Sequence, residues 1–196
     1  MQLWVPALTP KVGIVAGISG VGKTWLLEKV GAAIPMQVLS ASSLIRDSLL
    51  QTEKQQTSQD HLRARSIDEN QAALLEAFKR HLDPDRNLVI LDAHVVIDTP
   101  DGLAHIGSDV FDEIDPDFIV FIKDDPRRIH LNRERDAKRE RPERSVSSLA
   151  HQQEIAIKAA QDIAHSLSIP IHFVDGGDDE ALAKMLRLVQ EAETDV

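Results

Sequence analysis

Residues 17–24 read Gly17-Ile18-Ser19-Gly20-Val21-Gly22-Lys23-Thr24, which is the pattern of Gly, four residues, Gly, Lys and then Ser or Thr. The short apolar run 12–16 precedes this stretch, and a helix-compatible segment from Lys23 to about Ala33 follows it. A strand, a glycine-rich loop and a helix in this order are the context in which the pattern forms a phosphate-binding P-loop. We therefore expect an α/β fold of the P-loop NTPase class.

The P-loop residues have separate expected roles in holding a nucleoside triphosphate. Backbone N–H groups of the loop turn toward the phosphates, and the start of the helix adds a favourable potential for an anion. Lys23 is expected to reach the β- and γ-phosphates as a catalytic residue, and the Thr24 hydroxyl to bind Mg²⁺. The predicted ligands are thus ATP and Mg²⁺. The predicted nucleotide-binding residues are Gly17, Ser19, Gly20, Val21, Gly22, Lys23 and Thr24.

Four further apolar runs alternate with helix-compatible segments along the rest of the chain. Uniformly apolar strands are typical of a parallel sheet that helices cover on both faces. Together with 12–16 they predict a five-stranded parallel sheet in a doubly wound α/β fold. The further strands are expected at 36–39, 88–91, 118–122 and 169–174, and the later helices at about 44–50, 62–82, 126–141, 147–167 and 179–192.

The composition is that of one folded domain. A length of 196 residues suits one α/β core, so 1–196 is expected to form a single domain. The net charge of −10 argues against a general nucleic-acid or anionic-membrane surface. Cysteine is absent, and 1–10 lacks the charged region and apolar run of a signal peptide. We therefore expect a cytoplasmic protein without disulfides.

Asp92 and His94 follow the apolar run 88–91. Residues in this position lie at the carboxyl end of a buried strand, where ligands bind in open α/β sheets. Asp92 is therefore the expected second Mg²⁺ ligand, directly or through water, with a helix cap or a surface carboxylate as the alternative. His94 is expected to contact a phosphate or the acceptor substrate, and a histidine satisfied by local hydrogen bonds fits equally well.

The segment 127–144 concentrates positive charge in an otherwise acidic chain. It holds 8 of the 22 basic residues, namely Arg127, Arg128, Arg133, Arg135, Lys138, Arg139, Arg141 and Arg144. Some of them form i,i+4 pairs with glutamates that would decorate any solvated helix. The pairing leaves an excess of arginine, and arginines around a transferring phosphate stabilise its transition state. The excess favours a phosphate-clamping segment.

Two more positions carry candidate ligand contacts. Arg46 follows the second expected strand, and its guanidinium can hold an acceptor phosphate through two hydrogen bonds. Taken alone, it reads as an ordinary arginine on a helix surface. The stretch 175–177, Asp-Gly-Gly, comes directly after the last expected strand and is either a plain turn or a loop that meets a base.

These motifs resemble those of the adenylate kinases, a group of nucleoside monophosphate kinases, and in detail those of the archaeal-type enzymes. The similarity extends over most of the chain, from about residue 11 to 189. Residues 91–94 are similar to the family's strand ending in Asp-x-His, and 99–102 to the Thr-Pro-x-Gly after it. The most specific match is the lid pattern R-x-x-D-x-x-R-x-R with a His-Gln pair after it. Its members here are Arg133, Asp136, Arg139, Arg141 and His151-Gln152.

The resemblance implies a role for each matching segment. It implies a small lid at about 127–148 and an acceptor-binding helical insert at about 40–82. It also implies that the catalytic arginines are Arg133, Arg139 and Arg141, that Arg46 and His94 bind the acceptor, and that Asp175 and Gly176 contact the nucleotide base. The implied reaction transfers the γ-phosphate of Mg·ATP to a nucleoside monophosphate, with AMP the first choice. Archaeal-type relatives also suggest an oligomer.

Two departures from the family pattern bear on the acceptor. The chain reads Gln153-Glu154 where the pattern continues with Asn-Arg, and Trp25 replaces a small hydroxyl residue. Two alternative functions therefore stay open. The first is a kinase of a small-molecule hydroxyl, which Asp47 or Asp98 would orient. The second is a regulatory switch with slow ATP hydrolysis, and the absence of an Asn-Lys-x-Asp motif after 118–122 argues against guanine.

Overall fold

The computed structural model describes residues 10–53, 67–99, 102–136 and 142–191. A five-stranded sheet lies at its centre, with the strand order β2-β3-β1-β6-β7 and every pair parallel. This confirms the predicted five-stranded parallel sheet. The strands are β1 (Lys11–Ala16), β2 (Gln37–Ser40), β3 (Leu88–Asp92), β6 (Phe118–Lys123) and β7 (Ile171–Asp175).

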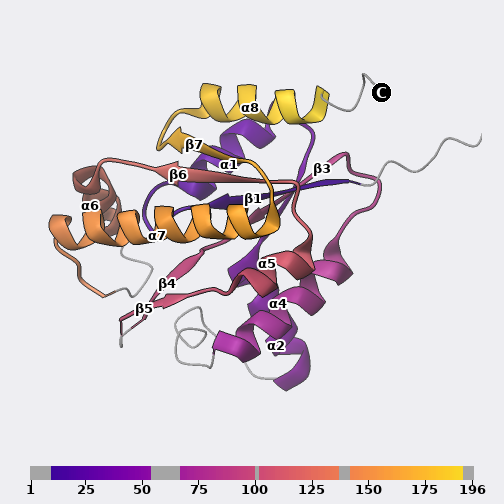
Figure 1. Ribbon diagram of the computed structural model, residues 1–196, viewed down its shortest axis with the longest axis horizontal. Coiled ribbons are helices and arrows are strands. Elements are labelled where there is room, and N and C mark those ends of the chain that lie inside the picture. The colour runs from indigo at the N-terminus through magenta and orange to yellow at the C-terminus, as the bar shows by residue number, and fades with distance from the viewer. Residues whose placement is uncertain (1–9, 54–66, 100–101, 137–141, 192–196) are drawn as a thin grey trace, which may run out of the picture.

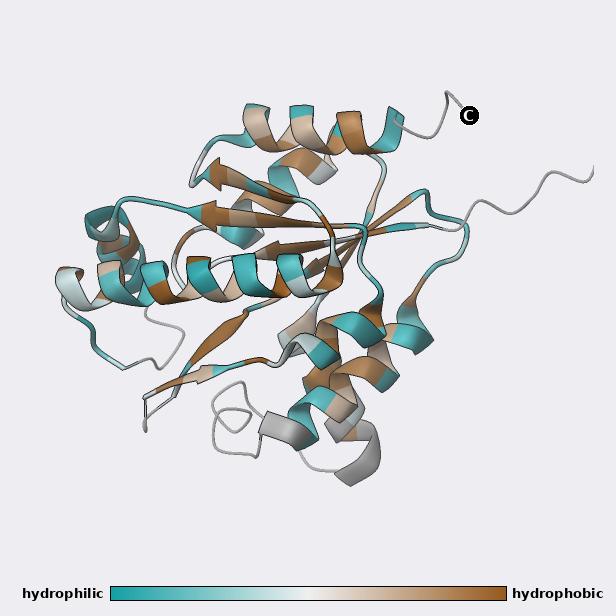
Figure 2. Cartoon of the chain, in the orientation of Figure 1, coloured by the Kyte–Doolittle hydropathy of each residue, from teal (hydrophilic) through white to brown (hydrophobic). Residues whose placement is uncertain are grey.

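The three inner strands form the centre of the core because they consist almost entirely of buried apolar residues. In β3, Leu88 to Leu91 are fully buried, and in β6 the exposed fraction is at most 1% from Phe118 to Ile122. Figure 2 shows the same strands as predominantly hydrophobic. Side chains on both sides of each strand are buried, so no alternation of polar and apolar residues appears in the sequence.

Helices cover both faces of this sheet (Figure 1). On one face α1 (Lys23–Gly31) packs against α8 (Asp179–Glu191), and on the other α7 (Val146–Leu167) lies along β6 and β7. Beyond one end of the sheet, α2 (Ala41–Glu53) packs against α4 (Ile67–His81). Within the described residues, no helix is long and apolar enough to cross a membrane.

A two-stranded antiparallel hairpin stands apart from the central sheet. Its strands are β4 (Val96–Thr99) and β5 (Gly102–His105), and the short helix α5 (Ser108–Ile114) follows it. The sequence did not predict these elements, because each strand is only four residues long and mixes polar with apolar side chains. The hairpin contacts α7, which brings β4 close to the P-loop side of the sheet.

Two predicted helices have different bounds in the structure. The helix expected at 126–141 is α6 (Pro126–Arg135), because Asp136 leaves the helical conformation at φ −90° and ψ 69°. Pro126 begins α6 behind an Asp125 cap, as a proline at the first helical position allows. The helix expected at 62–82 is observed as α4, and 62–66 lie outside the described residues.

Candidate active site

The P-loop joins β1 to α1 at the carboxyl edge of the central sheet. Gly22 caps α1 in the left-handed region, at φ 93°, and Gly20 has a φ of 92°. Only glycine adopts such angles at little cost, so the loop can turn its backbone toward a ligand. Gly20 is also crowded, because a Cβ on it would lie 2.7 Å from Cγ of Arg133.

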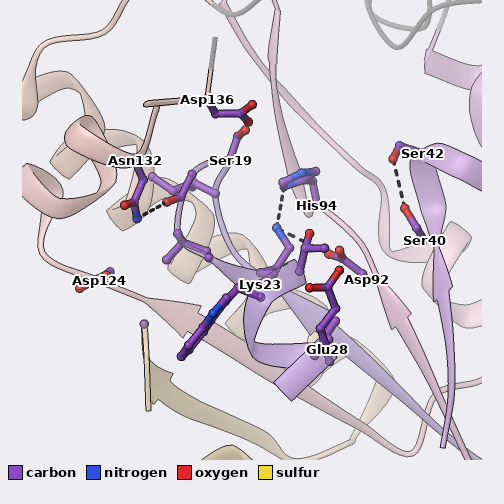
Figure 3. A pocket seen from close by; sticks show the side chains of 18 of the residues that line it. Ser19, Lys23, Glu28, Ser40, Ser42, Asp92, His94, Asp124, Asn132 and Asp136 are labelled. Atoms are coloured by element: carbon purple, nitrogen blue, oxygen red, sulfur yellow. Dashed lines mark hydrogen bonds and ion pairs between the residues drawn. The ribbon is translucent and has the colours of Figure 1, made fainter. Parts of the chain in front are cut away.

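Lys23 is the first residue of α1, and its side chain is 7% exposed. Its Nζ donates a hydrogen bond to the carbonyl oxygen of Gly17 at 2.9 Å and lies 3.7 Å from the Asp92 carboxylate. Figure 3 shows the ammonium group between Asp92 and His94. The P-loop carbonyl and the carboxylate thus hold the charge of Lys23 at the place where phosphates are expected.

His94 contacts the same P-loop carbonyl. Its Nδ1 is 2.7 Å from the oxygen of Gly17, and since a carbonyl only accepts, Nδ1 carries the proton. The 3.5 Å contact between Nδ1 and Nζ of Lys23 is then one between two donors. His94 therefore makes a local hydrogen bond, as one of its two predicted roles requires. His94 also lines a cavity over the P-loop, so the ring can keep this hydrogen bond and still contact a substrate there.

A cavity of about 840 Å³ lies over the P-loop. Its wall is formed by the loop and the start of α1, by the end of β2 and start of α2, by α6, and by the loop after β7. Of the predicted residues it includes Ser19, Gly20, Val21, Gly22, Lys23, Thr24, Asp92, His94 and Gly176. Three other lining residues belong to segments that the sequence singled out: Arg128 to the basic segment 127–144, Asp136 to the lid pattern and Gly177 to the stretch 175–177. The lining residues that were not predicted as part of the site include Trp25, Glu28, Asp124 and Asn132.

Asp175 does not belong to the described lining of this cavity, although the adjacent Gly176 does. The Asp175 carboxylate forms an ion pair with Lys123 at 3.1 Å, and its side chain is 65% exposed.

The side-chain amide of Gln153 accepts a hydrogen bond from the backbone N–H of Asp124 at 3.0 Å and donates one to the backbone carbonyl of Asp124 at 2.9 Å. This double contact holds the loop after β6 against α7.

Arg133 lies on α6 with its guanidinium turned to the P-loop, and its side chain is 8% exposed. Nε donates to the carbonyl oxygen of Ser19 at 2.8 Å, and Nη2 donates to Oε1 of Gln152 at 3.3 Å. Asn132 adds a bond from Nδ2 to the carbonyl oxygen of Gly20 at 3.0 Å. Arg133, which the resemblance placed in the lid segment, is thus packed on the P-loop.

Asp98 on β4 connects Arg133 to Arg144. Its carboxylate lies 3.5 Å from Nη1 of Arg133, and it accepts hydrogen bonds from Arg144 at 2.8 Å to Nη2 and 3.4 Å to Nε. The hydrogen bond and the negative charge of Asp98 raise the pKa of Arg144 above its usual value. One carboxylate between two guanidinium groups leaves a surplus of positive charge beside the P-loop.

A second cavity, of about 170 Å³, lies between the hairpin, α2, α4 and α5. Most of its wall is apolar, with polar groups from Asn70, Gln71, Asp98 and Gln152. The two cavities have four lining residues in common, Ser19, Ala41, Ser42 and His94. The smaller cavity therefore adjoins the larger one at the P-loop.

Of the other arginines predicted to be catalytic or to bind the acceptor, only Arg46 belongs to the described residues, and it does not join this arrangement. Arg46 on α2 contacts Asp47 at 3.4 Å and does not belong to the described lining of either cavity. Arg139 and Arg141 lie outside the described residues. Gln152, which the sequence named as part of the lid pattern, is a buried polar side chain on the apolar face of α7.

Comparison with known proteins agrees with this geometry. The model of a family described as an AAA domain matches residues 16–150, which is more than half of the chain. An adenylate kinase of Thermoplasma acidophilum is 30% identical over 184 residues, 90% of this chain and 97% of that enzyme. An adenylate kinase of Sulfurisphaera tokodaii is 30% identical over 144 residues, 69% of this chain and 74% of that enzyme.

The chain belongs to the adenylate kinase family of P-loop kinases. Membership of this family identifies an ATP-dependent phosphotransferase. Among solved structures, a shikimate kinase from Acinetobacter baumannii matches with a TM-score of 0.56 and 13% identity, over 95% of this chain and 96% of that one. At that identity the likeness shows that this adenylate kinase family member shares the fold, and it says nothing about the acceptor.

Proposed function

We propose that this protein transfers the γ-phosphate of Mg·ATP to a nucleoside monophosphate, with AMP as the first choice. The observation that carries the proposal is the pair of adjoining cavities. Ser19 and His94 line both of them, and Lys23 contacts His94 at this boundary. The larger cavity would hold the nucleoside triphosphate. The smaller, mostly apolar cavity would hold the base or sugar of the acceptor.

The proposed reaction needs no strong general base. An oxygen of the acceptor phosphate forms a new bond to the γ-phosphorus, and the bond from this phosphorus to the β,γ-bridging oxygen breaks. The bond's electron pair leaves with ADP, and a phosphate dianion has no proton to lose. Positioning and positive charge are then the main requirements. Lys23 and Arg133 supply that charge from two sides of the P-loop.

The residues at the P-loop fit a magnesium ion that arrives with ATP. Thr24 and Asp92 line the large cavity and offer the hydroxyl and carboxylate oxygens that Mg²⁺ prefers. In the described part of the chain, no cluster of three or more His, Asp or Glu side chains could hold a metal. This agrees with an ion bound mainly by phosphates and water. When bound, it would neutralise charge on the phosphates, while Lys23 orients them.

A kinase of a small-molecule hydroxyl is the second candidate, and Asp98 is the observation that favours it. Its carboxylate lines the small cavity, where it could orient a hydroxyl group. Both of its oxygens, however, already face guanidinium groups of Arg133 and Arg144. Because these guanidinium groups already engage the oxygens that would orient a hydroxyl, we place the nucleoside monophosphate first.

A product assay separates these functions. The protein would be incubated with Mg·ATP and, one at a time, AMP, CMP, UMP, GMP and a panel of small alcohols including shikimate. We expect ADP and a nucleoside diphosphate in equal amounts, fastest with AMP. Formation of ADP with a phosphorylated alcohol would instead support the second candidate. Release of inorganic phosphate alone, at a rate independent of any acceptor, would replace both by slow ATP hydrolysis.

A further inference from the structure

Asp98 occupies an unusual position for an acidic residue next to a phosphate site. Its side chain is 9% exposed, it lines the small cavity, and it belongs to the hairpin outside the central sheet. A buried carboxylate beside bound phosphates would repel them unless its charge were compensated. Arg133 and Arg144 provide that compensation at 3.5 and 2.8 Å.

The guanidinium of Arg133 faces three different elements through its three nitrogens. Nε faces the P-loop at Ser19, Nη2 faces α7 at Gln152, and Nη1 faces β4 at Asp98. Contacts in three directions leave a planar group only one orientation. Among the contacts of Arg133 with described residues, the one with Asp98 brings a negative charge to the buried cation and so helps to keep it in place.

We propose that Asp98 is a positioning residue for phosphoryl transfer, which acts by holding Arg133 in place against the P-loop. This inference rests on the proposed function, because it assigns Arg133 to the phosphates. A donor already aimed at the place where charge develops needs no reorganisation during the reaction. Without the charge of Asp98, the Arg133 and Arg144 guanidinium groups repel each other, and Arg133 loses one buried counter-charge.

The distances indicate which nitrogen would serve the substrate. The 3.5 Å between Nη1 of Arg133 and Asp98 exceeds the roughly 2.7–2.9 Å of a strong charge-assisted hydrogen bond. Arg144, at 2.8 Å, makes the tighter bond to the same carboxylate. Nη1 makes the longest of the three contacts, so it is the nitrogen that would donate to a phosphate oxygen while the guanidinium keeps its orientation, and Arg144 then keeps Asp98 neutralised.

A double-mutant cycle in the full-length protein tests this role. Asp98→Asn keeps the size of the side chain and removes its charge, and Arg133→Met removes the guanidinium and keeps the aliphatic stem that packs on Gly20. We expect Asp98→Asn to lower kcat by roughly 10- to 100-fold and to change the KM for ATP by less than about 3-fold. In the Arg133→Met background, the same change should lower kcat by less than about 2-fold.

The exchange of the Arg133 Nε–H proton with water gives a second readout that needs no activity. NMR should show slow exchange in the wild type, because this proton is bonded to Ser19, and at least roughly 10-fold faster exchange in Asp98→Asn. Asp98→Glu keeps the charge and provides a folded variant with an intermediate kcat. Asp162→Asn is the matched control, since Asp162 pairs with Lys158 on the exposed side of α7, and it should leave both readouts unchanged.

Two results would overturn the proposal. One is an equal loss of kcat from Asp98→Asn with and without Arg133, which would mean that Asp98 acts by another route. The other is unchanged exchange at Arg133 in Asp98→Asn. If the wild type phosphorylates no acceptor, the proposed function fails by itself, and the exchange measurement still decides whether Asp98 holds Arg133.

Discussion

The buried polar side chains mark the site at the scale of single residues. Lys23, Gln152, Arg133 and Asp98 are all at most 9% exposed, and each contacts another member of the site or the P-loop backbone. Burial of a polar group costs free energy unless its hydrogen bonds are satisfied, so packing alone does not favour a polar side chain at a buried position. Their convergence on one loop is what distinguishes this site from the rest of the core.

Trp25 is the large aromatic residue that lines the cavity of about 840 Å³ over the P-loop. Its side chain is 48% exposed directly after Thr24, and Nζ of Lys29 lies 5.1 Å from the centre of the ring. An exposed indole in a nucleotide cavity provides a flat surface for a base or sugar. We expect Trp25→Ala to weaken ADP binding by about 1 kcal/mol, roughly 5-fold in Kd, as measured by calorimetry.

Inorganic tripolyphosphate provides the control for Trp25, because it fills the P-loop without a nucleoside. Its Kd should be the same in the wild type and in Trp25→Ala. In a Trp4→Phe background, Trp25 is the single tryptophan of the chain, and ADP but not tripolyphosphate should change its fluorescence. Equal loss of affinity for both ligands would mean that Trp25 supports the loop and does not contact the nucleoside.

The contact between the P-loop and α6 can be tested at the scale of elements. Gly20 and Gly22 have nearly the same φ, 92° and 93°, so alanine costs similar backbone strain at both. Only Gly20 is crowded: a Cβ there would meet Arg133, whereas a Cβ on Gly22 meets nothing within 4 Å. We expect Gly20→Ala to lower the free energy of unfolding by about 1–3 kcal/mol more than Gly22→Ala, measured by urea denaturation.

A second substitution shows whether Arg133 causes the difference. Arg133→Ala removes the Cγ atom that a Cβ on Gly20 would meet. In that background, the extra cost of alanine at position 20 over position 22 should fall markedly, because only the 3.3 Å approach of the Cβ to the carbonyl oxygen of Ile129 remains. If the two glycine variants are already equal in the wild-type background, α6 does not pack on the loop as the structure has it.

The elements differ in how far their sequence predicted them. The P-loop and the inner strands were predictable because a local motif and uninterrupted apolar runs define them. The β4–β5 hairpin was not, because its short strands carry mixed side chains and depend on contacts with α7. For the same reason, the sequence suggested Asp98 only as one of two residues that would orient a substrate hydroxyl in the alternative function. Its contacts with Arg133 and Arg144 join residues 35 and 46 positions apart, which no local pattern records.

The polarity of the sheet organises the whole molecule. Because all five strands are parallel, the P-loop, Asp92 and the loops after β6 and β7 meet at one edge. The second cavity lies farther out, between the hairpin and α2, α4 and α5, which are outside the central sheet. The triphosphate site of our proposal thus follows from the sheet, while the acceptor site depends on the elements outside it.

The adjoining cavities lead to a prediction for the whole protein. A bisubstrate analogue, two adenosines bridged by five phosphates, should span both cavities, because they meet at Ser19 and His94 beside Lys23. A ligand at about 100 times its Kd stabilises the folded state by about 2.7 kcal/mol. For a chain of this size, that corresponds to a rise in Tm of roughly 5–10 °C. Thermal unfolding with a concentration series of the analogue measures the effect.

The comparison with single substrates decides whether the small cavity takes a nucleotide. At equal concentration, the analogue should raise Tm more than ATP or AMP alone, because one molecule gains the contacts of both sites without a second loss of translational freedom. Lys23→Ala should reduce the stabilisation by ATP and by the analogue, since both place phosphates at the P-loop. If the analogue stabilises the protein no more than ATP does, its second adenosine remains outside the small cavity. In that case the acceptor would be sought among smaller molecules that fit a space of about 170 Å³.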